Sequence, residues 1–171
     1  MSAIPDMIGF AVMTVSDSRD AKTDKTGPWL REQIAAEGHA VIDHAIVADD
    51  IGAIQNRLQA WIADPAIHAV IATGGTGLTG RDVTPEAFKP LYDKEMDGFS
   101  AVYHQVSFRS VGVSTIQSRA TAGIAGGTYL FAIPGSMGGC KDVWNHILKD
   151  EFDRTHRPCN LVDLIPRLME R

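Results

Sequence analysis

The sequence predicts a three-layer α/β fold in which helices flank a mostly parallel sheet. Strand-like and helix-like segments alternate along the chain, which is typical of parallel strands joined by crossover helices. The chain has 171 residues, of which 44% are hydrophobic and 22% are charged, and this suits one compact domain over residues 1–171. No low-complexity tract, long linker or internal repeat interrupts the sequence. We therefore expect a single domain with a substantial core.

The first half of the chain predicts strands separated by helices. Apolar runs indicate the strands, and apolar residues at helical spacing indicate the helices. Pro28 suits the first position of the first helix, and Gly38 suits its end. The expected elements, in chain order, are a strand at 8–15, a helix from Pro28 to Gly38, a strand at 39–47, a helix at 51–62 and a strand at 67–71.

The second half predicts further helices and one more strand. A helix is expected to start at Thr84-Pro85-Glu86 and to be limited by Pro90. Residues 91–98 do not have the character of a strand that ends in an acid, and Asp97-Gly98 indicates a turn. The remaining elements are a helix at 99–108, a tight connection at 125–128, a strand at 129–133 and a last helix after Pro134-Gly135-Ser136.

Charge and composition argue against several classes of partner. A formal charge of -5 and a pI near 5.6, without a local cluster of Lys or Arg, predict no binding to nucleic acid. The N-terminus lacks the basic stretch of a secretory signal, and its best apolar run, residues 7–15, is too short to cross a membrane. Cys140 and Cys159 have no CxxC spacing, so we expect reduced thiols. We expect a cytoplasmic protein.

A glycine-rich segment, Ala72 to Glu86, is the most informative part of the chain. It reads ATGGTGLTGRDVTPE and joins a predicted strand to a predicted helix. Its four glycines lack the Cβ atoms that would hold the backbone away from a ligand. Successive backbone N–H groups suit a phosphate, and the carboxylate of Asp82 suits a hard cation that accompanies phosphate. The segment therefore predicts a site for phosphorylated ligands.

Two familiar nucleotide motifs fit this segment poorly. Residues 75–80 have the G-x-G-x-x-G spacing of dinucleotide-binding proteins, but the predicted helix starts only near Pro85 instead of at the glycines. A nicotinamide or flavin enzyme is therefore the weaker hypothesis. The phosphate-binding P-loop requires a Gly-Lys-Ser/Thr after the loop, and none follows.

Acidic residues follow several of the predicted strands. Ligands of open parallel sheets bind outside the carboxyl ends of the strands, so the segments with Asp17, with Asp49 and Asp50, and with Asp82 are expected to meet at one edge. Two acids at that edge could share a metal. Either Asp49 or Asp50 could instead cap the helix that starts at Ile51.

The other candidate residues also have structural alternatives. Asp82 could simply form a turn before Thr84, which is the better N-cap. Ser136 could cap the last helix, although capping and phosphate binding use the same N–H groups. The six histidines show no pair at metal-ligand spacing. Trp29, Trp61 and Trp144 fall on or near apolar helix faces, which indicates core or subunit contacts.

Several motifs together resemble those of one family. They are residues 14–17 (TVSD), 24–27 (DKTG), 45–49 (AIVAD), 73–87, 117–120 (QSRA), 133–136 (IPGS) and 157–160 (RPCN). This set resembles the molybdopterin-binding MoaB/MogA family of molybdenum cofactor biosynthesis, in its B-type branch, and extends over nearly the whole chain. The TGGTG and RDVTPEA pair is the most specific part of the resemblance.

The resemblance implies the fold of that family and a reaction on molybdopterin. The terminal phosphate of molybdopterin would attack the α-phosphate of ATP, giving adenylylated molybdopterin and pyrophosphate, with Mg²⁺ present. Family analogy makes Asp49 and Asp82 the catalytic and metal-binding acids. The expected ligand-binding residues are Ser16, Thr73, Gly74, Gly75, Thr76, Gly77, Ser118, Arg119, Pro134, Gly135 and Ser136. Arg81, Arg119 and Lys141 are candidates for neutralising phosphate charge.

The chain departs from the family pattern after Ser136. Met137-Gly138-Gly139 stands where B-type relatives often carry a lysine, so one positive charge is expected to be missing. An alternative function is therefore a molybdopterin-binding or carrier protein that does not turn over ATP. Family members assemble as trimers and sometimes hexamers, so the resemblance also implies a homo-oligomer.

Overall fold

A six-stranded sheet forms the centre of the molecule, with strand order β2-β1-β3-β6-β5-β4. The computed structural model describes residues 4–170. Four neighbouring strands are parallel, and the last two are antiparallel to their neighbours. The strands are β1 (Gly9–Val15), β2 (Ala40–Val47), β3 (Ala69–Thr73), β4 (Lys94–Glu95), β5 (Thr121–Ala125) and β6 (Thr128–Ile133). This confirms the predicted α/β class and the mostly parallel sheet.

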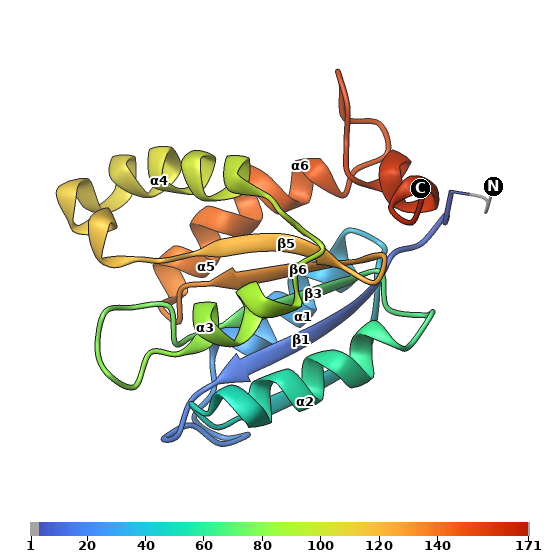
Figure 1. The fold of residues 1–171 in the computed structure, drawn as a ribbon. Coiled ribbons are helices and arrows are strands. Elements are labelled where there is room, and N and C mark those ends of the chain that lie inside the picture. Colours follow the sequence, from blue (N-terminus) through green and yellow to red (C-terminus); the bar gives the residue numbers. More distant parts are fainter. Residues whose placement is uncertain (1–3, 171) are drawn as a thin grey trace.

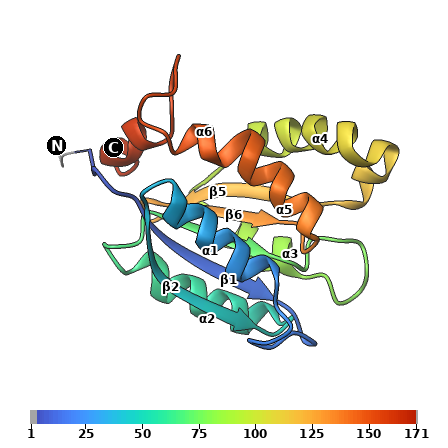
Figure 2. The same ribbon diagram turned by 180° about the vertical axis from the view of Figure 1, so that it is seen from behind.

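Helices cover both faces of the sheet (Figures 1 and 2). One face carries α1 (Thr26–Ala36), α4 (Asp97–Val111) and a continuous helical segment made of α5 (Met137–Val143), a π-helical turn (Trp144–Leu148) and α6 (Lys149–Glu151). The other face carries α2 (Ile51–Ile62) and α3 (Thr84–Phe88). Short 3₁₀ helices span Lys89–Leu91, Gly112–Gln117 and Val162–Arg167. The molecule thus has the three layers that the sequence predicts.

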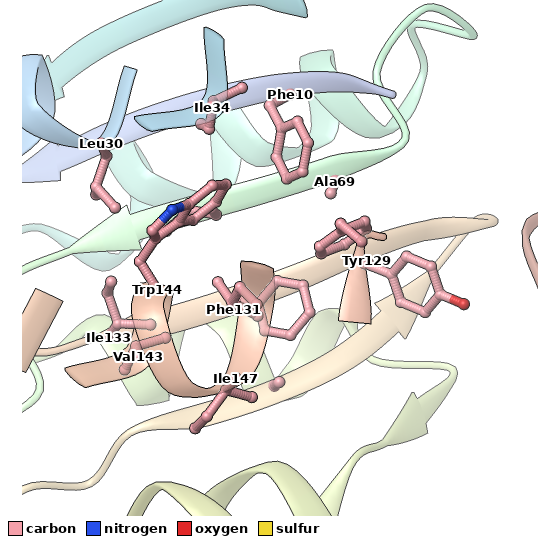
Figure 3. Packing of buried hydrophobic residues seen from close by; sticks show 14 of the residues in the cluster. Phe10, Leu30, Ile34, Ala69, Tyr129, Phe131, Ile133, Val143, Trp144 and Ile147 are labelled. Atoms are coloured by element: carbon pink, nitrogen blue, oxygen red, sulfur yellow. The ribbon is translucent and has the colours of Figure 1, made fainter. Parts of the chain in front are cut away.

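The core consists of two apolar clusters, one on each face of the sheet. Phe10 and Val12 of β1 belong to one cluster, whereas Ala11 and Met13 belong to the other, because side chains alternate along a strand. Every residue of β1 is buried, as expected of a strand covered on both faces. Figure 3 shows the larger cluster, in which Trp144 packs edge-on to Phe10 with ring centroids 6.3 Å apart. Trp144 is therefore a core residue.

The sequence missed part of the sheet and two helix starts. Helix α1 begins at Thr26 instead of Pro28, and Asp97-Gly98 begins α4 instead of forming a turn before it. The two antiparallel strands, β4 and β5, were not predicted, because β4 has two residues and β5 is built mostly from small residues without an alternating pattern. The tight connection at 125–128 is confirmed. Gly126 and Gly127 both have positive φ, as the two central residues of a type I′ hairpin turn require.

The carboxyl ends of the four parallel strands lie together. Val15 of β1 is in register with Val47 of β2, and Thr73 of β3 is in register with both Thr14 of β1 and Ile133 of β6. Backbone hydrogen bonds continue just past the strands, from Ser16 N–H to the carbonyl of Val47 and from Gly74 N–H to the carbonyl of Ile133. The loops that follow these strands therefore start side by side.

Two further features of the described residues concern helix hydrophobicity and the cysteines. Within residues 4–170, no helix combines the length and the apolar character needed to cross a membrane. Cys140 is buried, Cys159 is exposed, and both are free thiols, as predicted.

Candidate functional site

The loops after β1 and β2 are joined through two aspartates. The backbone N–H of Asp17 donates a hydrogen bond to Oδ2 of Asp49, and the N–H of Asp49 donates one to Oδ1 of Asp17, both at 3.0 Å. Asp50 has an extended backbone and caps α2, since its Oδ1 accepts a hydrogen bond from the N–H of Ala53 at 2.7 Å. Asp50 is therefore the helix cap, and Asp49 is the acid that faces the neighbouring loop.

The glycine-rich segment, residues 72–86, passes close to this aspartate. Gly75 has a φ of 67°, and a Cβ atom there would lie 2.3 Å from Oγ1 of Thr84 and 3.2 Å from Oδ1 of Asp49. A Cβ atom on Gly77 would lie 2.8 Å from Oδ2 of Asp82. No side chain fits at either glycine without displacing a neighbour. The carboxylates of Asp49 and Asp82 therefore lie against backbone positions two residues apart in the same loop.

Asp82 is fixed by a turn in the glycine-rich segment. Its Oδ2 accepts hydrogen bonds from the N–H of Thr79 at 2.9 Å and from Oγ1 of Thr79 at 2.7 Å. The predicted N-cap at Thr84 is wrong: Val83 occupies that position without a side-chain bond, and Oγ1 of Thr84 donates to the carbonyl of Gly74 at 2.8 Å. Thr84 thus ties the start of α3 back to the glycines.

The structure gives the two aspartates different protonation behaviour. Burial raises the pKa of Asp49 above its usual range, and the nearby charges of Asp17 and Asp82 raise it further. Burial also acts to raise the pKa of Asp82, but the hydrogen bonds from Thr79, together with the backbone of Gly77 and the charge of Arg119, outweigh it and the pKa is lowered. Asp82 is therefore the better-stabilised carboxylate, and Asp49 is the one that gains more from a nearby cation.

The chemistry of this pair suits Mg²⁺. The hydrogen bonds just described are accepted by Oδ2 of each carboxylate. Oδ1 of Asp49 and Oδ1 of Asp82 accept none of them. In the part of the chain that the structure describes, no three His, Cys, Asp or Glu side chains gather as a metal cluster. Mg²⁺ is commonly held by one or two carboxylates together with water and substrate phosphates, so two acids are sufficient. These residues fit a metal that arrives with its ligand.

Arg119 is hydrogen-bonded to the backbone of the glycine-rich segment. Its backbone N–H donates a hydrogen bond to the carbonyl of Thr76, its side-chain Nε to that of Gly77 and its Nη2 to that of Asp82, each at 2.8 Å. Its Nη1 pairs with Glu86. Because these three carbonyls point toward Arg119, they point away from the opposite side of the loop. Arg119, which the sequence predicts as ligand-binding, is thus placed to shape the loop.

An open cleft of about 850 Å³ lies beside the loop. Eight residues of the predicted site line it: Gly75, Thr76, Gly77, Asp82, Ser118, Pro134, Gly135 and Ser136. Five do not: Ser16, Thr73, Gly74, Asp49 and Arg119. Oγ of Ser136 caps α5 by accepting from the N–H of Gly139 at 3.1 Å, as one of its two predicted roles requires.

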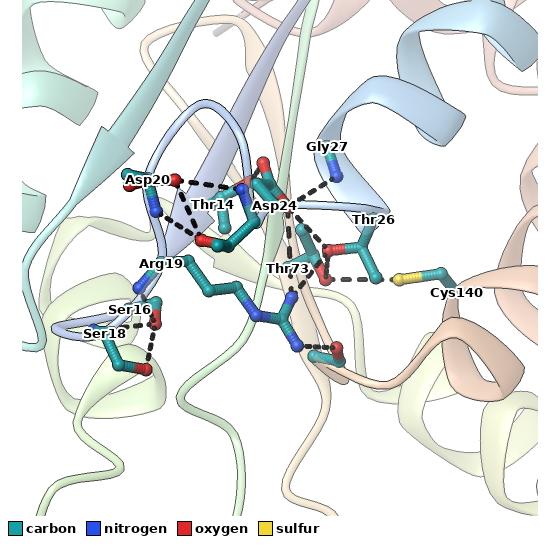
Figure 4. Close-up of polar contacts among 12 residues, drawn as sticks. Thr14, Ser16, Ser18, Arg19, Asp20, Asp24, Thr26, Gly27, Thr73 and Cys140 are labelled. Atoms are coloured by element: carbon teal, nitrogen blue, oxygen red, sulfur yellow. Dashed lines mark hydrogen bonds and ion pairs between the residues drawn. The ribbon is translucent and has the colours of Figure 1, made fainter.

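Two predicted ligand residues make structural contacts between and within the loops (Figure 4). Oγ of Ser16 accepts hydrogen bonds from the N–H groups of Ser18 and Arg19, both at 3.2 Å, and so closes a local turn. Thr73 is buried, and its Oγ1 donates to the carbonyl of Pro134 at 2.9 Å. Figure 4 also shows Arg19 reaching across to this region, where its Nη2 donates to the carbonyl of Gly135. These residues fix the loops relative to one another.

The sequence missed most of the far wall of the cleft, of which it named only Lys141 as a candidate. That wall comes from α4, from the Gly112–Gln117 turn and from α5. Its polar residues are the hydroxyl-bearing Tyr103, Ser107, Ser110, Ser114 and Thr115, together with Gln117, Lys141 and Asp142. Oγ1 of Thr115 is buried and has no hydrogen-bond partner among residues 4–170. Several polar residues on one stretch, 107–118, were a usable signal. Their relation to the glycines depends on tertiary packing, which the sequence pattern does not specify.

The helix after the glycine-rich segment separates this site from a dinucleotide fold. Helix α3 starts at Thr84, as predicted, so the glycines at 75–80 do not open it. Residues 91–98 do contain a strand, β4, but it is two residues long and antiparallel at the far edge of the sheet. It cannot supply the acid that follows the glycines in a dinucleotide-binding unit.

Known proteins resemble the chain over most of its length. Residues 11–154 match the family described as "Probable molybdopterin binding domain". Molybdenum cofactor biosynthesis protein B of Escherichia coli K12 is 45% identical over 150 residues, which are 88% of this chain and 88% of that protein. The protein of the same name from Bacillus subtilis 168 is 38% identical over 149 residues, covering 86% and 88%.

Solved structures agree with the sequence comparison. A crystal structure of molybdenum cofactor biosynthesis protein B has a TM-score of 0.87 and 33% identity, covering 98% of this chain and 99% of that one. The tungsten cofactor synthesizing protein MoaB of Pyrococcus furiosus has a TM-score of 0.73 and 34% identity, covering 86% and 93%. The sequence match and the shared fold together show that the chain belongs to the molybdopterin-binding family described as "Probable molybdopterin binding domain".

Proposed function

We propose that this protein acts in molybdenum cofactor biosynthesis by binding molybdopterin and adenylylating it with Mg²⁺ and ATP. The observation that carries the proposal is the position of the Asp49 and Asp82 carboxylates, beside Gly75 and Gly77 of one loop. The open cleft next to that loop has room for a ligand of the size range seen in small-molecule sites. The family membership supports molybdopterin as the ligand.

The reaction transfers a nucleotidyl group between phosphates. An oxygen of the terminal phosphate of molybdopterin forms a bond to the α-phosphorus of ATP, and the bond from that phosphorus to pyrophosphate breaks. Mg²⁺, when held by Asp49 and Asp82, would neutralise negative charge on the phosphates. The chain contributes positioning: Arg119 and Thr84 hold the glycine-rich segment rigid, and its backbone comes close to the ligand because it lacks side chains.

The two neighbouring aspartates provide a matched test of this proposal. The Asp49→Asn variant should lower adenylyl transfer by roughly a hundredfold or more, because it removes one charge from the metal pair. The Asp50→Asn variant should keep near wild-type activity, because asparagine caps a helix as well as aspartate does. The measurement is the formation of adenylylated molybdopterin and pyrophosphate from molybdopterin, Mg²⁺ and ATP.

The same assay separates the enzyme from the alternative function. If the wild-type protein binds molybdopterin but releases no pyrophosphate, it is a binding or carrier protein and the adenylylation proposal fails. Equal activity in Asp49→Asn and wild type would instead remove Asp49 from the mechanism. Stoichiometric binding of NAD(P) or flavin would favour an oxidoreductase.

We further propose a homo-oligomer, either a trimer or a hexamer. Large apolar side chains gather at the end of α4 and in the turn after it, where Val113 is 73% exposed and Ile116 is 76% exposed. Phe108 and Val111 of α4 are also exposed. Contiguous exposed apolar residues are typical of protein contacts, so a second copy is a suitable occupant. The mass in solution distinguishes the two assemblies from a monomer.

A further inference from the structure

The cleft beside the glycine-rich segment is lined by more acidic than basic side chains. Its lining contains the carboxylates of Asp82 and Asp142 and one basic side chain, that of Lys141. A phosphorylated ligand adds more negative charge next to these acids, which costs free energy unless a cation is nearby. The basic side chains around the cleft differ in how far they are already neutralised.

Three arginines near the loop are already engaged. Each makes an ion pair with a carboxylate, and two of them also donate hydrogen bonds to backbone carbonyls. The pairs are Arg119 with Glu86, Arg81 with Asp17, and Arg19 with Asp24. Moving any of these guanidinium groups onto a ligand would break contacts that hold the loops. They are therefore poor candidates for binding the ligand directly.

Lys141 is not engaged in this way. None of the ion pairs within residues 4–170 involves its ammonium group. The adjacent acid, Asp142, accepts a hydrogen bond from Oγ of Ser110 at 3.0 Å, which ties α5 to α4. Residues next to each other on a helix do not face each other, so Asp142 does not neutralise Lys141.

The glycines before Lys141 leave a path for its side chain. A helical side chain leans toward the N-terminus and covers the turn before its own Cα, which for Lys141 is the turn containing Gly138. A Cβ atom on Gly138 would meet no atom within 4 Å, and Gly138 also lines the cleft. The ammonium group can therefore extend over Gly138 toward Gly135 and Ser136.

We propose that Lys141 binds a phosphate group of the ligand, on the α5 side of the cleft and opposite the glycine-rich segment. The ligand chemistry is a phosphate ester or a polyphosphate. This inference rests on the proposed function and deepens it, since it names the cation that the chain itself contributes. It also gives a reason for the glycine at 138: a short residue there keeps the space above the first turn of α5 open.

Pyrophosphate with Mg²⁺ is a suitable probe, because its binding does not depend on turnover. Calorimetric titration should show binding weakened about tenfold or more in Lys141→Ala and largely retained in Lys141→Arg. Lys149→Ala is the matched control, since Lys149 lies on the same helical segment, pairs with Glu37 and is not part of the cleft. That control should bind like the wild type.

A relocated charge separates binding from a structural role. In the double variant Lys141→Ala/Gly138→Lys, a lysine at 138 lies in the same cleft and should restore most of the lost affinity. Circular dichroism of each variant checks that it is folded. Lys141→Ala with wild-type affinity, or no recovery in either Lys141→Arg or the double variant, would overturn the inference.

The result is distinguishable from failure of the proposed function. If the wild-type protein does not adenylylate molybdopterin but Lys141→Ala still loses pyrophosphate affinity, only the proposed enzyme activity fails. If Lys141→Ala adenylylates molybdopterin with unchanged KM values for both ATP and molybdopterin, only the assignment of Lys141 fails.

Discussion

Asp49 and Asp50 carry the same side chain and follow the same strand, yet their carboxylates have different partners. Asp50 caps α2, whereas Asp49 is held by the backbone of Asp17 and lies beside Gly75. The sequence could not separate them, because either position is compatible with a helix that starts near Ile51. The choice depends on the exact cap geometry, which the tertiary structure fixes.

The glycine-rich segment contains its own matched control. Gly75→Ala should lower the free energy of unfolding by roughly 1–3 kcal/mol, because residue 75 has positive φ and its Cβ would press on Oγ1 of Thr84. Gly80→Ala should change it by less than about 0.5 kcal/mol, because nothing lies within 4 Å of that Cβ position. Urea unfolding measures both. Equal stability of the two variants would contradict the described loop geometry.

Among the elements, those with strong local patterns were predictable. The strand at 129–133, the hairpin turn at 125–128 and the start of α3 at Thr84 agree with the sequence, because turn glycines, proline and apolar runs determine them locally. The short strands β4 and β5 were not predictable, since they form by pairing, β5 with β6 and β4 with β5. The hydroxyl groups of α4 that line the cleft were missed for a similar reason, because their position opposite the glycine-rich segment depends on tertiary packing.

Two central strands are linked by a histidine, which predicts that the stability of the fold depends on pH. Nδ1 of His68, just before β3, accepts a hydrogen bond from the N–H of Gly9 in β1 at 2.9 Å, and burial lowers the pKa of His68 below its usual 6.5. In the unfolded chain the imidazole binds a proton more readily. The contribution of His68 to stability is therefore complete above about pH 6.5 and is lost as the pH falls through the lowered value.

Unfolding by urea at several pH values tests this contribution. The wild-type free energy of unfolding should rise with pH across that window, and His68→Gln should flatten the rise because glutamine does not titrate. His146→Gln, at an exposed histidine, is the control and should keep the wild-type slope. A slope that His68→Gln leaves unchanged would assign the pH dependence to other groups.

The parallel sheet brings segments that are distant in the sequence together. The ends of β1, β2, β3 and β6 are in register, so residues 17, 49, 75 and 135 lie on loops that leave one edge of the sheet. The sequence predicted this edge from the alternation of strands and helices, which applies to any open parallel sheet. It did not predict which predicted side chains face the cleft and which hold the loops, as Ser16, Thr73 and Arg119 do.

We propose that Asp49 and Asp82 hold one divalent cation beside the glycine-rich segment. Titration with Mn²⁺ in place of Mg²⁺, in the presence of a non-hydrolysable ATP analogue and followed by electron paramagnetic resonance, measures this directly. We expect Asp49→Asn and Asp82→Asn each to weaken Mn²⁺ binding about tenfold or more, and Asp50→Asn to bind like the wild type. Wild-type Mn²⁺ affinity in either Asp49→Asn or Asp82→Asn would contradict a shared metal site.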